Sequence, residues 1–204
     1  LLWGYPLDGF NVFFQYSPVV AAIFWIVTGL WFFIKLLLTF GIKKKPAFLF
    51  GLMVLFGTNL FVYTFITPAF SHVYSFAVMA MLLFTIRKYF LLFDNKYLYL
   101  SAYLYGLLIL IRPVNAIALF VLPLLADSTT IFFKAFRYAT KPGKILLIIF
   151  FVVFAFSPQI IITTLQTGKP FIYGYANEGF YFAHPQIINF LFSYRKGWFV
   201  YTPL

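Results

Sequence analysis

Long apolar runs, separated by short polar or basic segments, are the feature that most constrains how this chain can fold. Residues 17–40 and 46–67 are each long enough to cross the roughly 30 Å hydrocarbon core of a bilayer as a helix. Hydrophobic residues make up 64% of the chain and charged residues only 9%, so too little polar surface remains for a water-soluble domain. The sequence therefore predicts an all-α polytopic membrane protein.

We expect about six transmembrane helices in one bundle that covers residues 17–163. The predicted spans are 17–40, 46–67, 70–86, 97–111, 113–126 and 145–163. The fourth and fifth are divided at Arg112 and Pro113, because proline removes a backbone donor and an arginine in the middle of one long helix would be costly in lipid. One kinked helix over the same residues is the alternative, and it would give five spans.

Three segments outside these spans have patterns of their own. Residues 1–16 are amphipathic and are expected to be extracytoplasmic or to lie in the membrane interface. Residues 127–144 are basic, with phenylalanines on one helical face, which predicts a helix in the membrane interface. Residues 164–204 are aromatic, glycine-bearing and too interrupted for a helix in lipid. We therefore expect an extracytoplasmic aromatic loop there, which could lead to a further span.

The chain carries 15 Lys and Arg against 4 Asp and Glu, a formal net charge of +11. In a chain this apolar, basic residues mark the cytoplasmic ends of membrane helices more often than a nucleic-acid surface. We therefore expect the lipid bilayer as a partner and no nucleic acid. The six-span arrangement puts most of the basic residues on the cytoplasmic side, and the five-span alternative puts nearly as many there. The high phenylalanine content indirectly favours a bacterial inner (plasma) membrane.

The composition also limits the chemistry. The chain has no cysteine, which excludes disulfides, thiolate nucleophiles and cysteine metal sites. Two histidines and four acidic residues are too few for a histidine-rich metal cluster. We expect no cofactor because no residue spacing requires a metal, and a divalent ion remains an open alternative.

With this orientation, the chemically capable side chains at the extracytoplasmic ends are Asp8, His72, Arg112, Glu178, His184, Arg195 and Lys196. Asp8 is interpreted either as an interfacial acid or helix cap, or as part of a substrate cleft. His72 opens a helix, where a capping role competes with catalysis. Arg112 either extends to the lipid headgroups or faces a water-filled vestibule, where its guanidinium suits a phosphate. The two interpretations of Arg112 are equally supported.

The C-terminal segment contains a series of short motifs. In order they are Gly168-Lys169-Pro170-Phe171, Gly174-Tyr175, Asn177-Glu178-Gly179-Phe180, His184-Pro185, Ser193-Tyr194-Arg195-Lys196-Gly197-Trp198-Phe199 and Thr202-Pro203, after a span that contains Ser157-Pro158-Gln159. This order resembles the membrane-embedded glycosyltransferases of the GT-C superfamily, including the dolichyl-phosphate-mannose protein mannosyltransferase-like and RgtA-like bacterial members. The helix junction at Arg112 and the turn at His72 are similar to features of the same proteins.

The resemblance implies a GT-C-like fold and an inverting transfer of a sugar from a polyprenyl-phosphate donor to an extracytoplasmic acceptor of unknown identity. In this family the base is usually an Asp in the first outer loop, just after the first span. That loop is missing here or represented only by its end. We therefore expect the main catalytic acid upstream of Leu1, with Asp8 and Glu178 as the candidates within this chain.

A lipid-linked sugar phosphate needs cations for the leaving phosphate, and Arg112, Arg195 and Lys196 can supply them. The expected substrate-binding residues are His72, Tyr173, Tyr175, Glu178 and His184. Among these, the tyrosines offer faces on which a pyranose ring can stack, and Glu178 offers a hydrogen bond to the sugar or the acceptor.

Two other classes of function fit the composition. A transporter or flippase for a lipid-linked substrate would also need a helical bundle with a recessed arginine, and should show helix-breaking positions near the middle of several spans. A noncatalytic assembly subunit would use the aromatic C-terminal segment as a platform for a partner. Apart from Gly51, Gly57, Asn59 and the Arg112 region, the helices offer few helix-breaking positions, which favours the glycosyltransferase.

Overall fold

The computed structural model describes residues 11–172, 185–194 and 197–201 of the 204-residue chain. Within these ranges every regular element is helical. The helices are α1 (Val12–Thr39), α2 (Lys44–Gly57), α3 (Leu60–Phe65), α4 (His72–Leu92), α5 (Asn95–Ile111), the 3₁₀ helix η1 (Pro113–Leu125), α6 (Thr129–Ala139), α7 (Pro142–Phe154), α8 (Ser157–Thr167), α9 (Ile187–Phe192) and α10 (Trp198–Tyr201). The expectation of an all-α fold is confirmed.

Three helical segments of the described chain are long and apolar enough to cross a bilayer. They are Val12–Thr39, His72–Leu92 and Pro142–Thr167, the last of which joins α7 and α8. These segments overlap the predicted spans 17–40, 70–86 and 145–163. Their length and composition make the chain a helical membrane protein, as the apolar runs indicate.

The other three predicted spans are shorter or interrupted in the structure. The predicted span 46–67 is divided into α2 and α3, because Thr58 adopts an extended conformation between them. The hydroxyl of Thr58 donates to the Val54 carbonyl at 2.6 Å and accepts from the Leu60 N–H at 3.3 Å, so it replaces backbone bonds that a continuous helix would make. The predicted spans 97–111 and 113–126 correspond to α5, which has 17 residues, and to the 13-residue 3₁₀ helix η1.

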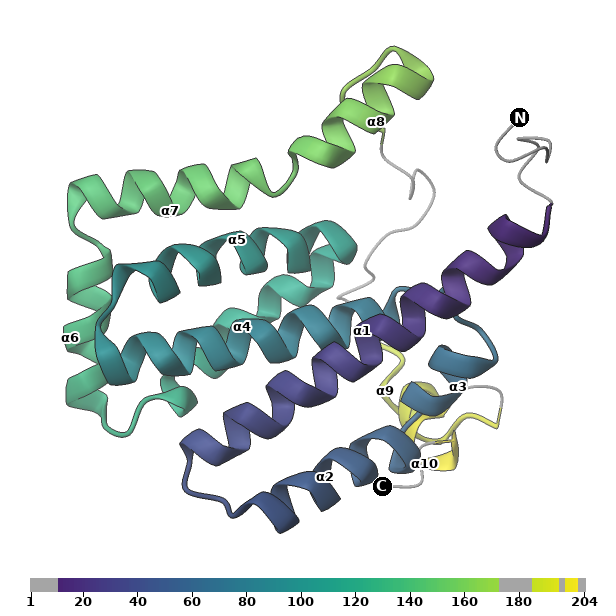
Figure 1. The fold of residues 1–204 in the computed structure, drawn as a ribbon, viewed down its shortest axis with the longest axis horizontal. Helices are drawn as coiled ribbons and strands as arrows, with labels where there is room; N and C mark the ends of the chain where they lie inside the picture. The colour runs from purple at the N-terminus through teal and green to yellow at the C-terminus, as the bar shows by residue number, and fades with distance from the viewer. Residues whose placement is uncertain (1–10, 173–184, 195–196, 202–204) are drawn as a thin grey trace.

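The bundle is built around α4, which packs between α1 and α5, while α7 packs on the far side of α5 (Figure 1). Glycines allow two of these close approaches. A Cβ atom at Gly29 in α1 would lie 2.9 Å from the Cα of Ala77 in α4. A Cβ atom at Gly106 in α5 would lie 2.5 Å from the carbonyl oxygen of Val152 in α7. The absence of a side chain at these two glycines therefore lets α1 pack closely on α4, and α5 on α7, as small residues do in membrane helix bundles.

Large apolar side chains cover the outside of this bundle as well as its core. Leu82 and Leu108 are fully buried between α4 and α5. By contrast, none of the residues of α7 is buried, although the segment is almost entirely apolar. A water-soluble protein would not expose such a surface, but hydrocarbon is a suitable solvent for it.

One end of the bundle collects most of the basic residues. The loop between α1 and α2, the loop between α4 and α5, helix α6 and the start of α7 all lie at this end, which we call the lysine-rich end (Figure 1). Its basic side chains include Lys43, Lys44, Lys45, Arg87, Lys88, Lys96, Lys134, Arg137, Lys141 and Lys144. Helix α6 lies across this end and is tied to α4 by a hydrogen bond of 2.9 Å from the Tyr89 hydroxyl to the Ala135 carbonyl.

Helices α5 and η1 run in opposite directions rather than as one kinked helix. The end of η1 returns to the lysine-rich end, where the Leu125 carbonyl accepts a hydrogen bond of 2.9 Å from Arg87. Its beginning lies at the other end of the bundle, where Asn115 donates to Ser75 at 3.2 Å. Of the two alternatives that the sequence leaves open for residues 97–126, the structure has two separate antiparallel segments.

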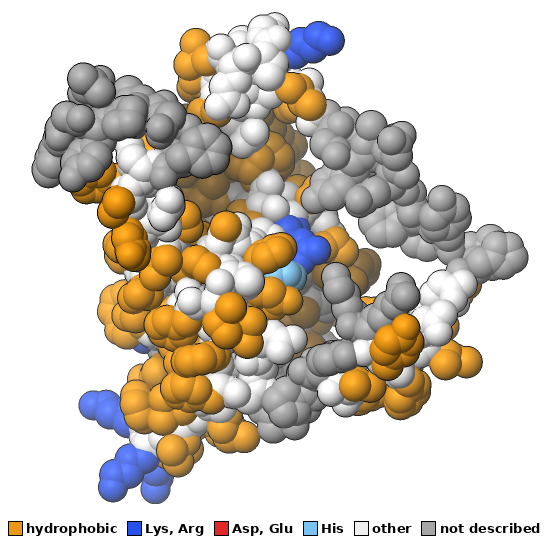
Figure 2. All heavy atoms as spheres, turned by 90° about the vertical axis from the view of Figure 1, so that its right-hand side faces the viewer, with side chains coloured by type: hydrophobic (Ala, Val, Ile, Leu, Met, Phe, Trp, Pro, Cys, Tyr) orange, Lys and Arg blue, Asp and Glu red, His pale blue; other side chains and the backbone are white. Residues whose placement is uncertain are grey.

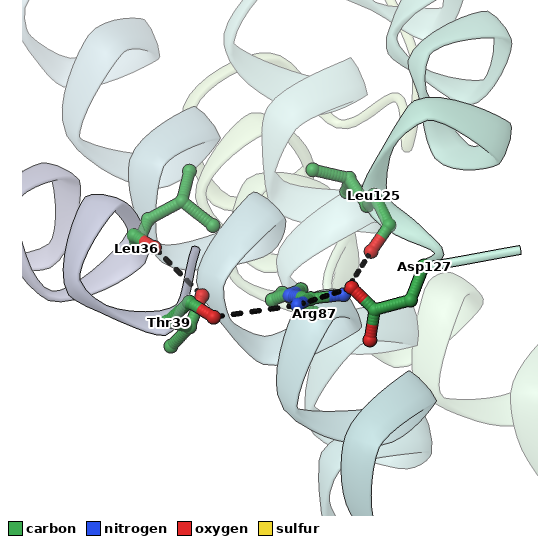
Figure 3. A network of polar contacts seen from close by, with 5 residues as sticks. All are labelled: Leu36, Thr39, Arg87, Leu125 and Asp127. Carbon is green, nitrogen blue, oxygen red and sulfur yellow. Dashed lines mark hydrogen bonds and ion pairs between the residues drawn. The ribbon is translucent and has the colours of Figure 1, made fainter. Parts of the chain in front are cut away.

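Arg87 connects three elements at the lysine-rich end (Figure 3). Arg87 directly follows the predicted span 70–86, and in the structure only 3% of it is exposed. Its guanidinium forms an ion pair of 2.7 Å with Asp127 and donates to the carbonyls of Leu125 at 2.9 Å and Thr39 at 3.3 Å. Burial of the charge is tolerated because the guanidinium has an acid and two carbonyls as partners.

Candidate functional site

The candidate site lies where α5 ends, at the end of the bundle opposite the lysine-rich end. Arg112 has an extended conformation, with φ −152° and ψ 118°, because the following Pro113 disfavours a helical backbone at this position. Its N–H still donates to the Leu108 carbonyl at 3.2 Å and closes the last turn of α5. The Arg112 side chain is thereby carried by the junction between α5 and η1.

Polar side chains satisfy the backbone groups that this junction leaves free. The amide of Asn115 donates to the Leu108 carbonyl and to the Ser75 hydroxyl, each at 3.2 Å. The Tyr105 hydroxyl donates to the Ala116 carbonyl at 3.1 Å. Non-helical backbone that is shielded from water requires such internal partners. The junction is therefore fixed to α4 and α5.

His72 is the partner of Arg112 in this site. Nη1 of Arg112 lies 3.3 Å from Nδ1 of His72, the first residue of α4. A guanidinium has only donors, so Nδ1 accepts the hydrogen bond and His72 is neutral with its proton on Nε2. The His72 ring also stacks on Tyr63 of α3, with 4.1 Å between centroids and 25° between planes. Figure 2 shows a histidine (pale blue) next to a Lys or Arg side chain (blue), near the middle of the face that is drawn there.

The electrostatics of the site are cationic within the described part of the chain. The two acids that the structure describes, Asp94 and Asp127, lie at the lysine-rich end and pair there with Lys96 and Arg87. No carboxylate among the described residues neutralises Arg112. The guanidinium retains N–H groups that do not bond to His72, and it is half-buried at the junction. An anion with several oxygen acceptors, such as a phosphate, suits this arrangement.

An apolar cavity of about 170 Å³ lies between α4, α5, η1, α6 and α7. Tyr105 lines it, and the same side chain bonds to η1 next to the Arg112 junction. Leu119 and Leu122 of η1 and Val152 of α7 form part of its wall. Its lining is almost wholly apolar, so it suits a segment of hydrocarbon chain rather than a polar ligand.

Of the site residues expected from the sequence, the structure brings Arg112 and His72 together. The remaining candidates lie outside the described residues: Asp8, Tyr173, Tyr175, Glu178, His184, Arg195 and Lys196. The described residues contain no group of three or more acids and histidines that could hold a metal ion.

Sequence reasoning missed two members of the site, Tyr63 and Ser75. Ser75 lies three residues after His72 and therefore on the same face of α4, a spacing that could have indicated it. No sequence signal marks Tyr63, because its approach to His72 depends on the break between α2 and α3. No known protein family, curated protein or solved structure matches this chain.

Proposed function

We propose that this protein is a membrane glycosyltransferase that moves a sugar from a polyprenyl-phosphate donor to an extracytoplasmic acceptor, with inversion. The observation that carries the proposal is the Arg112 guanidinium, which is half-buried at a helix junction, bonded to a neutral histidine and not paired with a described carboxylate. A cation held in this way can bind the phosphate of the donor and stabilise the negative charge that develops as the phosphate leaves.

In the proposed reaction, the hydroxyl oxygen of the acceptor attacks the anomeric carbon and the bond from this carbon to the phosphate oxygen breaks. The phosphate leaves with the electron pair, and the hydroxyl proton passes to a carboxylate. Arg112, with Arg195 and Lys196, would bind the phosphate. Within this chain, the candidates for this carboxylate are Asp8 and Glu178.

Other side chains would contact the sugar, and the apolar cavity would contact the isoprenoid chain. His72 can donate from Nε2 because its Nδ1 accepts from Arg112. Tyr173 and Tyr175 would stack on the sugar, and His184 would bond to it. The apolar cavity beside η1 would accept part of the isoprenoid chain.

The proposed arrangement in the membrane is the GT-C-like one with six crossings. Its spans would be α1, α2 with α3, α4, α5, η1, and α7 with α8. The lysine-rich end would be cytoplasmic, since positively charged loops are retained on that side. Arg112 and His72 would then open to the outside of a bacterial inner membrane.

The test uses the full chain in vesicles with a panel of polyprenyl-phosphate sugars, and follows the release of free polyprenyl phosphate. We compare the wild type with Arg112→Gln and Arg112→Lys, and use Lys43→Gln as a charge-matched control from the opposite end. We expect release by the wild type and the control, at least about a hundredfold less by Arg112→Gln, and partial recovery by Arg112→Lys. Release that is unchanged in Arg112→Gln, or absent with every donor in a folded protein, contradicts the proposal.

A transporter or flippase for a lipid-linked substrate is the second candidate, and one observation favours it. Apolar helices are interrupted at two places, between α2 and α3 and between α7 and α8. Discontinuous helices of this kind form substrate sites in many transporters. In the same vesicles, movement of the intact lipid-linked sugar between leaflets, without release of polyprenyl phosphate, would favour this candidate.

A further inference from the structure

An open hollow of about 460 Å³ lies on the face of α6 that points away from the bundle core. We call it the basic pocket. It is lined by Phe93, Phe133, Lys134, Arg137, Tyr138 and Lys141. Half of this lining is cationic and the other half is aromatic, a combination that the proposed glycosyl transfer does not use.

The cations of the basic pocket face no described carboxylate. Asp127 is the nearest acid along the chain, and it forms an ion pair with Arg87. Asp94 follows Phe93, but its carboxylate pairs with Lys96 at 3.1 Å. Lys134, Arg137 and Lys141 therefore leave a positive potential over the hollow, which a ligand with an anionic group would neutralise.

The way α4 ends places Phe93 in the wall of the pocket. Its φ of 54° puts a bulky residue in the left-handed region, where glycine is the usual choice. This conformation ends α4 and brings the Phe93 ring to 5.2 Å from Nζ of Lys134. The Phe93 ring therefore forms one wall of the pocket beside Lys134.

The position of the pocket relative to the membrane indicates what occupies it. Phe93 directly follows the candidate span His72–Leu92, and Lys141 directly precedes the candidate span Pro142–Thr167. In the proposed membrane arrangement, both residues lie where a helix leaves the hydrocarbon, at the depth of lipid phosphates. Phe133, which is 66% exposed, offers an apolar contact next to the cations. A ligand that joins an anionic group to a hydrocarbon chain matches all these features.

We propose that the basic pocket binds the headgroup phosphate of an anionic phospholipid. Arg137 and the two lysines bind the phosphate oxygens, and Phe93 and Phe133 contact the glycerol and the first methylene groups of the chains. The bound lipid holds α6 across the end of the bundle. This site is independent of Arg112 and of any glycosyl transfer.

The full chain is reconstituted in phosphatidylcholine with phosphatidylglycerol, then extracted in mild detergent, and the retained phosphatidylglycerol is counted by native mass spectrometry. The pocket variant is Lys134→Gln with Arg137→Gln and Lys141→Gln. The control is Lys43→Gln with Lys44→Gln and Lys45→Gln, which removes the same charge from the same end without changing the pocket. We expect the wild type and the control to retain the lipid, and the pocket variant to bind it at least about tenfold more weakly.

Equal losses in both triple variants would show a general attraction of the lysine-rich end for anionic lipid and would overturn the specific site. Displacement of the lipid by millimolar inorganic phosphate would show a site for a free anion and would overturn it too. If the triple pocket variant does not fold, Arg137→Gln and Phe93→Gly decide. Glycine adopts the φ of position 93 without strain, so Phe93→Gly should fold and still retain less lipid. Unchanged retention in both single variants contradicts the proposal.

Discussion

At the scale of single residues, the ion pair of Arg87 with Asp127 differs from that of Lys96 with Asp94 in how far water reaches it. Arg87 is 3% exposed and has fixed backbone partners, whereas both members of the second pair are accessible to water. Removal of one partner from a buried charge leaves that charge under-compensated, while exposed pairs contribute little. The first pair should therefore matter more for stability.

We expect Asp127→Asn to lower the free energy of unfolding by about 1–3 kcal/mol, and Asp94→Asn to lower it less. The expected loss of stability for Asp127→Asn is modest because the Asp127 side chain is 50% exposed and water partly screens the ion pair. Thermal unfolding of the purified chain in one detergent measures both. Equal shifts of the two midpoints would show that the buried arginine does not depend on Asp127.

His72 has two separable roles at the same scale, as an acceptor for Arg112 and as a stacking partner for Tyr63. His72→Phe keeps an aromatic ring for the stack and removes the acceptor. His72→Asn offers an oxygen near the position of Nδ1 and removes the stack. If the acceptor orients the guanidinium, His72→Phe should weaken binding of a polyprenyl phosphate about tenfold, and His72→Asn should weaken it less.

Binding to vesicles that contain the radiolabelled lipid phosphate, with the amount of folded protein measured in parallel, distinguishes the two substitutions. The reverse order, with His72→Asn the weaker binder, would assign His72 a packing role and leave Arg112 without an orienting partner.

At the scale of helices, the long apolar runs predict α1, α4 and α7 with α8, because length and hydropathy alone define a candidate span. Proline also marks the junction after Arg112 correctly. Gly57 and Asn59 mark a helix-breaking position, but the predicted span 46–67 continues through it; the break itself depends on the Thr58 hydroxyl, and threonine occurs in many unbroken helices. The 3₁₀ form of η1 has no clear sequence signal either.

In the candidate site, the local sequence predicts one feature and does not predict another. The chemistry of Arg112 could be inferred from its position before proline. Its contact with His72 spans 40 residues, and it arises because α4 and α5 pack side by side, with the end of α5 next to the start of α4. Sequence patterns report local periodicity, so a pairing of this kind requires the packed helices.

The approach of α5 to α7 at Gly106 leads to a prediction at the helix scale. A methyl group at this position would clash with the Val152 carbonyl and with Ala155, whose Cβ lies 2.7 Å from the added atom. We expect Gly106→Ala to destabilise the bundle by about 1–3 kcal/mol. Gly143→Ala in the first turn of α7 is the control, because nothing lies within 4 Å of its added Cβ and alanine favours a helix.

The thermal midpoint in detergent should fall for Gly106→Ala and stay level or rise for Gly143→Ala. An unchanged midpoint for Gly106→Ala would mean that α7 shifts on α5 without cost, and that this contact does not fix the helix.

At the scale of the whole molecule, the lysine-rich end and the Arg112 end lie at opposite ends of the bundle. The number of times that the chain crosses the membrane decides which of its loops lie on the same side. With α5 and η1 as separate antiparallel crossings, Lys43 and Thr140 lie on the same side, and Lys169 lies on the other. If residues 97–126 crossed only once, Thr140 would lie opposite Lys43. The two arrangements therefore differ in a measurable way.

The chain has no cysteine, so single cysteines can be introduced at these positions without a background. In intact cells, we expect an impermeant thiol reagent to label Lys169→Cys and to label Lys43→Cys and Thr140→Cys only after permeabilisation. Labelling of Thr140→Cys together with Lys169→Cys would remove the crossing by α7 and α8. Labelling of Thr140→Cys alone would show that residues 97–126 cross only once. Labelling of Lys43→Cys and Thr140→Cys, but not of Lys169→Cys, would reverse the positive-inside orientation on which the outward opening of the Arg112 site depends.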